Sequence, residues 1–210
     1  MQQPPDSLAA QLFLLAVDPG RRRLTGRGEL GYVLRAAALV ELQLSGHLVD
    51  DGGRPSASGG PPVPDPLLDA VLRQVAADPR RRWRYWVRKD ARWMTWAVRD
   101  QLAASRRIEL EPYRILGVLP AQRIIIRDPL VRDRIVGAID AALSDAWPVG
   151  ARTAALVALA AAAEMRIVLP RSRRRAHRER IAQLTERTGP LPPVLRKVLR
   201  DQRAAAVGAG

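Results

Sequence analysis

The hydrophobic residues of this chain recur mostly at the spacing of α-helices. One stretch, residues 30–48, is apolar around most of its circumference, which is typical of a helix buried at the centre of a domain. Gly46 stands near its end, where a left-handed helix terminus favours glycine. Further helices are predicted over residues 8–17, 66–77, a basic region ending near 105, 129–144, 151–163, 171–188 and a last stretch to about 206.

Two helix starts are marked by an aspartate followed by a proline, at Asp65–Pro66 and Asp128–Pro129. An aspartate side chain accepts hydrogen bonds from the free N–H groups of a first helical turn, and proline suits the first helical position because it lacks an N–H. Between the central helix and Asp65, residues 51–64 are rich in glycine, proline and serine. This composition predicts a mobile loop.

The main strand-like region is residues 108–127, where short strands are expected at 108–111, 113–119 and 122–127. A turn at residues 119–122 would make a β-hairpin. Its middle is unusually apolar for a two-stranded ribbon, so one face is expected to pack on the helices and the other to meet a partner, a membrane or a second subunit. The residues assigned to this surface are Leu116, Val118, Leu119, Ile124 and Ile126.

Together these elements predict a mainly α protein, with a single globular helical domain over residues 7–206 from which the β-hairpin protrudes. Residues 1–6 are expected to be disordered and residues 207–210 to fray. No apolar run reaches the roughly 20 residues that a membrane-spanning helix needs. The N-terminus also lacks the basic-then-apolar order of a signal peptide, so we expect a cytoplasmic protein.

Charge narrows the classes of partner. The chain has 35 basic and 21 acidic residues and a formal net charge of +14. A field of this size favours nucleic acid, an anionic membrane surface or a phosphorylated ligand. Nearly all of the positive charge is arginine and alanine is abundant, which also indicates a GC-rich bacterial genome. The absence of cysteine excludes disulfides and cysteine catalysis.

Basic and aromatic residues are concentrated over residues 79–99. Four tryptophans there would share one face of a continuous helix: Trp83, Trp86, Trp93 and Trp96. A stripe of this kind favours the core, whereas the neighbouring arginines favour a ligand site or a membrane interface. Arg88, Arg92 and Arg99 follow helical spacing and can converge on one ligand, and planar guanidinium groups suit phosphate oxygens.

Arg35 and Glu41 interrupt the apolar surface of the central helix. They are six positions apart and therefore point in different directions. A guanidinium on a buried helix needs an anionic partner, because an unpaired buried charge is very costly. Two interpretations of Arg35 remain open: an ion pair with another helix, or a place in the wall of an anion-binding pocket.

No arrangement of residues indicates catalysis. His47 and His177 are far apart and fit no metal-ligand spacing. No serine lies in a G-x-S-x-G context, and no glycine-rich loop ends in G-K-[ST]. Acidic residues at helix starts are explained by capping. We therefore expect a binding protein that is not an enzyme and has no metal site and no cofactor.

An ordered set of segments resembles the Golgi phosphoprotein family, including its bacterial members. The segments are L-F-L-L-A-V-D (12–18), G-Y-V-L-R-A-A-A-L-V-E-L-Q-L-S-G-H-L (31–48), D-P-L-L-D-A-V-L (65–72), V-R-D-Q-L (98–102), R-I-L-G-V-L-P-A-Q-R-I-I-I-R-D (114–128) and R-T-A-A-L-V-A-L-A-A-A-A (152–163). The resemblance covers roughly residues 7–182. It implies a mostly helical domain with a β-hairpin. Eukaryotic members bind phosphatidylinositol 4-phosphate on the cytosolic face of the Golgi and act as adaptors that retain glycosyltransferases.

The resemblance also implies a lipid-headgroup pocket, which in the family uses a tryptophan, an arginine on the central helix and a pair of arginines on a later helix. Arg35 matches the central-helix arginine and Arg99 matches one of the pair. The other two positions fall near Trp96 and near Gly26. The residues expected to bind the headgroup are Arg35, Arg99, Trp96, Arg92 and Arg27. The family uses its apolar hairpin for membrane insertion and self-association, which implies a homo-oligomer formed through the hairpin.

Three hypotheses follow. The first is a peripheral membrane protein that binds an anionic, phosphoinositide-like phospholipid through these arginines and is anchored by the hairpin. The second is a nonspecific nucleic-acid-binding protein that uses the arginines of residues 80–92 and 171–180. It is less favoured because the sequence contains no recognised nucleic-acid-binding motif. The third is a helical scaffold for a protein partner, in which the charge reflects only genome composition.

Overall fold

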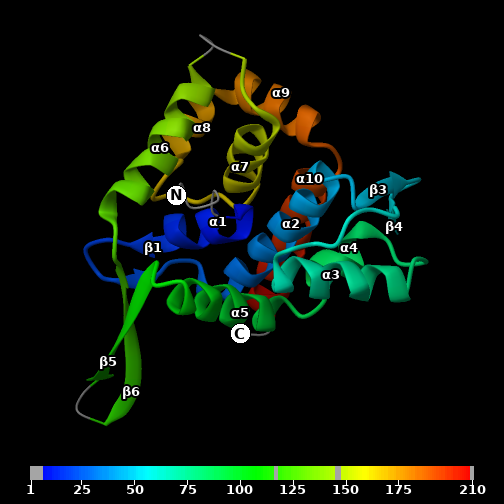
Figure 1. The fold of residues 1–210 in the computed structure, drawn as a ribbon. Coiled ribbons are helices and arrows are strands. Elements are labelled where there is room, and N and C mark those ends of the chain that lie inside the picture. The colour runs from blue at the N-terminus through cyan, green and yellow to red at the C-terminus, as the bar shows by residue number, and fades with distance from the viewer. Residues whose placement is uncertain (1–6, 116–117, 145–147, 209–210) are drawn as a thin grey trace.

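The computed structural model describes residues 7–115, 118–144 and 148–208. Within these residues the chain forms ten helices and three two-stranded antiparallel sheets, which confirms the mainly α prediction (Figure 1). Residues 1–6, expected to be disordered, lie outside the described part, as do the last two residues of the expected frayed tail. The final helix extends to Gly208, two residues beyond the expected end.

The helices are α1 (Leu8–Ala16), α2 (Arg27–Leu44), α3 (Pro66–Ala77), α4 (Trp83–Arg88), α5 (Ala91–Ala104), α6 (Pro129–Leu143), α7 (Ala151–Ala162), α8 (Arg171–Ala176), α9 (Arg178–Thr188) and α10 (Leu191–Gly208). The paired strands are β1 (Val17–Asp18) with β2 (Arg23–Leu24), β3 (Leu48–Asp51) with β4 (Arg54–Ala57), and β5 (Ile108–Ile115) with β6 (Leu119–Ile126).

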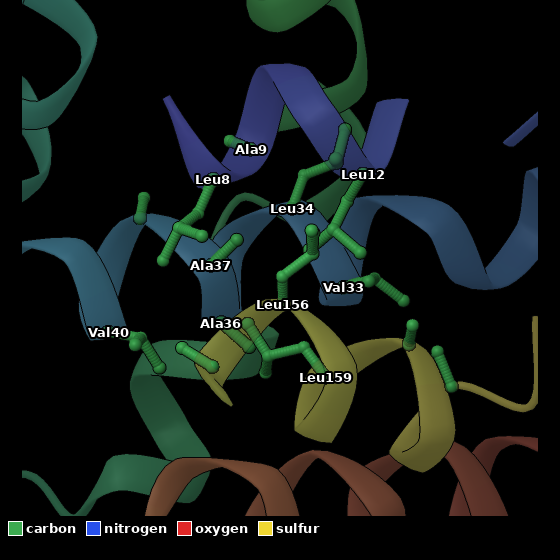
Figure 2. Packing of buried hydrophobic residues seen from close by; sticks show 14 of the residues in the cluster. Leu8, Ala9, Leu12, Val33, Leu34, Ala36, Ala37, Val40, Leu156 and Leu159 are labelled. Atoms are coloured by element: carbon green, nitrogen blue, oxygen red, sulfur yellow. The ribbon is translucent and has the colours of Figure 1, made fainter. Parts of the chain in front are cut away.

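Helix α2 is the centre of the fold, as its apolar circumference predicted. It contacts α1, α3, α4, α5, α7 and α10. Figure 2 shows α2 between α1 and α7, with Leu8 and Leu12 of α1 on one side and Leu156 of α7 on the other. Alanines such as Ala36 and Ala37 face these neighbours, and small side chains let helix axes approach closely. Each fully buried leucine stabilises the fold by about 1.5–3 kcal/mol relative to an exposed one.

The starts of α3 and α6 and the end of α2 follow local signals in the sequence. The carboxylate of Asp65 accepts hydrogen bonds from the backbone N–H groups of Leu67 and Leu68 at 2.8 and 3.2 Å, and thereby caps α3 as predicted. Asp128 caps α6 in the same way. Just after the C-terminal end of α2, Gly46 has a φ of +77°, the left-handed conformation that glycine adopts without strain.

The helical region expected up to Ser105 is divided. Asp90 has a φ of +53°, so α4 ends before it and α5 begins after it in a new direction. Consequently the four tryptophans do not share one environment. Trp83 and Trp86 on α4 are 1% exposed and belong to the core, whereas the side chains of Trp93 and Trp96 on α5 are 45% and 58% exposed. The core interpretation is therefore confirmed for Trp83 and Trp86 and is wrong for Trp93 and Trp96, whose role in a ligand site or at a membrane stays a prediction.

The β5–β6 hairpin projects from the helical body beside α5, at the lower left of Figure 1. Its register pairs Ile108 with Ile126 and Ile115 with Leu119. The turn therefore lies between Ile115 and Leu119, which corrects the predicted turn at residues 119–122. Pro120 is compatible with a strand here because each strand of a two-stranded ribbon has a free edge, where a missing N–H breaks no ladder.

Residues 51–64 were expected to form a loop throughout. Instead Arg54–Ala57 is a strand that pairs with Leu48–Asp51, and Gly52 and Gly53 form the tight turn between them with φ values of +56° and +84°. These two glycines supply the left-handed conformation that such a hairpin turn requires. The expected loop is thus confined to the residues that connect Ala57 with α3.

Candidate functional site

A cavity of about 810 Å³ lies between α5, the beginning of α2 and the middle of the β5–β6 hairpin. It combines guanidinium groups with apolar and aromatic side chains. Such a mixture suits a ligand that carries a charged group on a less polar body. Its walls are formed by Leu24, Arg27, Arg92, Thr95, Trp96, Arg99, Pro112, Tyr113, Arg114, Ala121, Gln122 and Ile124.

Helix α5 supplies one wall through its periodicity. Arg92, Thr95, Trp96 and Arg99 are spaced by three or four residues and therefore share the face that lines the cavity. The neighbouring face of α5 packs into the core through Ala91, Met94, Val98 and Leu102. Burial of this apolar face fixes the rotation of α5 and so determines which residues reach the cavity.

The beginning of α2 approaches α5 closely because residue 31 is glycine. A Cβ atom at Gly31 would lie only 1.9 Å from the carbonyl oxygen of Ala91, so no other residue fits there without a shift of the backbone. Arg27 lies four positions before Gly31, on the same face of α2. The contact therefore holds Arg27 beside the first turn of α5, where Arg92 also lines the cavity.

The arginines differ in how they are partnered. The guanidinium of Arg99 donates to Oδ1 of Asp100 through Nε at 2.8 Å and Nη2 at 2.6 Å, and to Oε1 of Gln122 through Nη1 at 3.4 Å. Its Cζ also lies 4.5 Å from the ring centroid of Trp96, within cation–π distance. In the described part of the chain, neither Arg27 nor Arg92 forms an ion pair. Their charges are therefore available to an anion in the cavity.

The hairpin forms the opposite wall, and local sequence does not indicate this. Two guanidinium groups approach the ring of Tyr113, with Cζ of Arg23 at 5.0 Å and Cζ of Arg123 at 4.7 Å from its centroid. Ile124 is 5% exposed and forms part of the apolar floor. Tyr113, Arg114 and Gln122 become cavity residues only because β5 and β6 pair in this register next to α5.

Arg35 does not line this cavity. Its side chain is fully buried, Nε donates to the carbonyl oxygen of Trp86 at 3.1 Å, and Nη2 donates to Oε1 of Gln74 at 2.6 Å. Burial lowers the pKa of Arg35 to about 10, against an opposing effect of the negative charge of Asp90. Both hydrogen-bond acceptors are neutral groups. They hold Arg35 on the α3–α4 side of α2, apart from the other four predicted headgroup residues, which line the cavity.

Glu41, the second charge on α2, has a structural role. One carboxylate oxygen accepts a hydrogen bond at 2.8 Å from the backbone N–H of Leu8, at the first turn of α1. The other forms an ion pair with Arg152 at the start of α7. Glu41 thus joins the three helices that pack together in the core.

The hairpin residues predicted to contact a membrane or a second subunit are placed differently from one another. Val118, in the turn, is 77% exposed. Ile124 is buried, and Ile126 packs against the core, so both lie at the base of the hairpin rather than on its outer surface. For Leu119 the structure describes the backbone pairing alone, and Leu116 lies outside the described residues.

The arginine clusters proposed for nucleic acid are partly engaged within the protein. In the first cluster Arg84 pairs with Asp201 at 2.7 Å. In the second, Arg173 pairs with Asp140, and Nη1 of Arg174 donates to the carbonyl oxygen of Leu169 at 2.7 Å. Three exposed arginines remain on the surface of α8 and α9: Arg171, Arg175 and Arg178.

The two histidines are apart in the structure as in the sequence. His47 is nearly buried, with Nδ1 2.8 Å from Oγ of Ser45 and Nε2 2.8 Å from the carbonyl oxygen of Pro61, whereas His177 lies at the junction of α8 and α9. Among the residues that the structure describes, no group of three or more His, Asp or Glu is arranged to hold a metal ion. In the same residues, no helix has the length and apolarity required to cross a bilayer.

The fold and the cavity define a mainly helical domain with a basic, partly apolar cavity beside a projecting hairpin. Residues 8–202 of the chain match the family described as Golgi phosphoprotein 3 (GPP34). The chain belongs to this family, which confirms the resemblance recognised in the sequence. A comparison with curated proteins gave no match.

Proposed function

We propose that this chain is a non-catalytic peripheral membrane protein of the cytoplasm that binds an anionic phospholipid headgroup, similar to phosphatidylinositol 4-phosphate, in the cavity beside α5. The observation that carries the proposal is the convergence of Arg27, Arg92 and Arg99 on one cavity beside the hairpin that exposes Val118. A phosphomonoester offers several acceptor oxygens, and planar guanidinium groups bind them in a bidentate manner.

Magnitudes support reversible binding at a surface. Each arginine or lysine near an anionic bilayer contributes about 1 kcal/mol. Arg27 and Arg92, which form no ion pair in the described part of the chain, therefore contribute about 2 kcal/mol together, and Arg99 contributes less because Asp100 already pairs with it. Burial of an exposed valine such as Val118 in the bilayer adds about 1.5 kcal/mol or more. Neither term alone gives stable attachment, and therefore headgroup and hairpin are expected to act together.

The exposed tryptophans of α5 fit the same orientation. Trp93 and Trp96 are both exposed, and Trp96 lines the cavity. Tryptophan is favoured where an apolar bilayer interior meets polar headgroups, because it joins a large ring to an N–H donor. With α5 and the hairpin at one edge of the molecule, as in Figure 1, one face can present the ring systems, the arginines and the turn to a bilayer.

The test is co-sedimentation with vesicles of phosphatidylcholine alone and with added phosphatidylinositol 4-phosphate, phosphatidylinositol or phosphatidylserine. Binding should require the anionic lipids and be strongest with the phosphomonoester. The double variant Arg92→Ala, Arg99→Ala should lose most of it. The matched control is Arg171→Ala, Arg175→Ala, which removes the same charge from exposed positions on α8 and should bind nearly as well.

Three results separate the other hypotheses. Equal binding to neutral vesicles would refute headgroup recognition. Competition by soluble inositol phosphate, without sedimentation on vesicles, would indicate a free phosphorylated ligand. The nucleic-acid hypothesis would be favoured by a mobility shift of DNA or RNA that weakens steeply with salt and is also seen with the Arg92→Ala, Arg99→Ala double variant.

A further inference from the structure

The position of the first turn of α5 depends on two residues of α2 that share a face. Gly31 and Arg35 are four positions apart, and therefore both lie on the face of α2 that contacts the α4–α5 junction. At Gly31 the backbone of α2 approaches the carbonyl oxygen of Ala91. At Arg35 the guanidinium binds the carbonyl oxygen of Trp86, near the end of α4. The junction that separates the buried tryptophans from the exposed ones is thus held by α2.

A relay of hydrogen bonds continues from Arg35 to α5. Nη2 of Arg35 donates to Oε1 of Gln74 at 2.6 Å, and Nε2 of Gln74 lies 3.4 Å from Oδ2 of Asp90. Asp90 is the residue before α5, and its left-handed conformation sets the direction of the helix. The side chain of Asp90 does not cap α5, so its carboxylate is available to Gln74.

The burial of Arg35 separates this role from direct ligand contact. Its side chain has 0% exposure and does not line the cavity that holds Arg27, Arg92 and Arg99. Its remaining nitrogen, Nη1, is buried and has no hydrogen-bond acceptor among the described residues. A side chain in this position does not contact a ligand in the cavity, but it can influence the ligand through the elements that it holds.

We propose, on the basis of the proposed function, that Arg35 and Gln74 are positioning residues that fix the start of α5 and thereby align its cavity face without touching the headgroup. The aligned residues include Arg92 and Trp96, in the first two turns of α5. Residues that modulate a site through packed elements typically change affinity by roughly two- to thirtyfold.

The first test compares three variants in the absence of lipid. Gln74→Ala removes the central link without changing charge, and Gln74 is only partly buried, so the variant should fold. Arg35→Lys keeps the charge but cannot hold two acceptors in a planar geometry. Arg73→Ala, at the exposed neighbour of Gln74, is the control. Amide hydrogen exchange over residues 91–96 should quicken in the first two variants and stay unchanged in the control.

The second test measures affinity for vesicles that contain phosphatidylinositol 4-phosphate. Gln74→Ala and Arg35→Lys should each bind roughly two- to thirtyfold more weakly than the wild type. In the background Arg92→Ala, Arg99→Ala, the same two changes should have a clearly smaller further effect, because two of the α5 residues through which they act are already removed. A purely structural defect would instead lower the melting temperature without this dependence on Arg92 and Arg99.

Direct contact of Arg35 with the phosphate makes opposite predictions. Gln74→Ala would then bind like the wild type, and Arg35→Lys would retain most of the affinity through its charge. Either result, or unchanged exchange over residues 91–96 in Gln74→Ala, overturns the positioning role. If wild-type protein binds no anionic vesicle, the proposed function fails, and the exchange comparison still decides whether Arg35 and Gln74 hold the start of α5.

Discussion

The contact between Gly31 and Ala91 can be probed with a single methyl group. The substitution Gly31→Ala would place a Cβ atom 1.9 Å from the carbonyl oxygen of Ala91 and 3.1 Å from Oγ1 of Thr95. The obstructing atom belongs to the backbone of α5, which cannot rotate away as a side chain does. Because nonbonded heavy atoms rest about 3.5 Å or more apart, α2 and α5 must separate by more than an ångström at this point.

Two effects of opposite sign set the magnitude. Alanine favours a helix interior over glycine by about 1 kcal/mol. Insertion of a methyl group into a closely packed interface costs about 1–3 kcal/mol, and more where the backbone obstructs it. We therefore expect Gly31→Ala to lower the free energy of unfolding by about 1–2 kcal/mol, which corresponds to a fall in Tm of roughly 2–8 °C for a chain of this size.

The assay is urea unfolding followed by circular dichroism, with Gly137→Ala as the matched control. Gly137 lies within α6 and has nothing within 4 Å of an added Cβ atom, so this change should stabilise the protein by about 0.5–1 kcal/mol. Gly31→Ala should also weaken vesicle binding, because it moves Arg27 away from Arg92. If the two alanine variants are equally stable, the close approach of α2 and α5 does not exist as described.

Three further predictions concern separate parts of the molecule. Val118→Asp should weaken binding to anionic vesicles by about tenfold or more in co-sedimentation and leave Tm unchanged, because the side chain is exposed in the free protein. In urea unfolding, Trp86→Ala should lower the free energy of unfolding by about 3–5 kcal/mol, because the side chain is buried. Trp96→Ala should lower it by less than about 0.5 kcal/mol and still weaken vesicle binding, because this side chain is exposed. Glu41→Gln should destabilise the protein by about 1–3 kcal/mol in the same unfolding assay, because it removes the charge that holds Arg152 and the N–H of Leu8.

Much of the candidate site follows from periodicity along one helix. Arg92, Trp96 and Arg99 share a face because a helix repeats every 3.6 residues, and the structure places all three at one cavity. Arg27 joins them from the start of α2. Arg35 shows the limit of this reasoning. Its helix has neighbours on every side, and local spacing does not tell which neighbour a given side chain reaches.

The division of the tryptophan stripe has a similar cause. A helix through Asp90 would place Trp83, Trp86, Trp93 and Trp96 on one face, and only the left-handed conformation of Asp90 separates the first pair from the second. Aspartate adopts that conformation more readily than most residues but does not require it. The contacts of α2 and α3 with the α4–α5 junction decide the outcome, and they are distant in sequence.

The sequence by itself determined the features that depend on neighbouring residues. These are the apolar α2, the aspartate–proline starts of α3 and α6, and the existence of the apolar hairpin. The tertiary structure alone decided the turn between Ile115 and Leu119, the strand at residues 54–57 and the separation of Arg35 from the cavity. The reason is physical: caps and amphipathic faces arise within a few residues, whereas strand register and the partners of a buried guanidinium are set by atoms that only folding brings together.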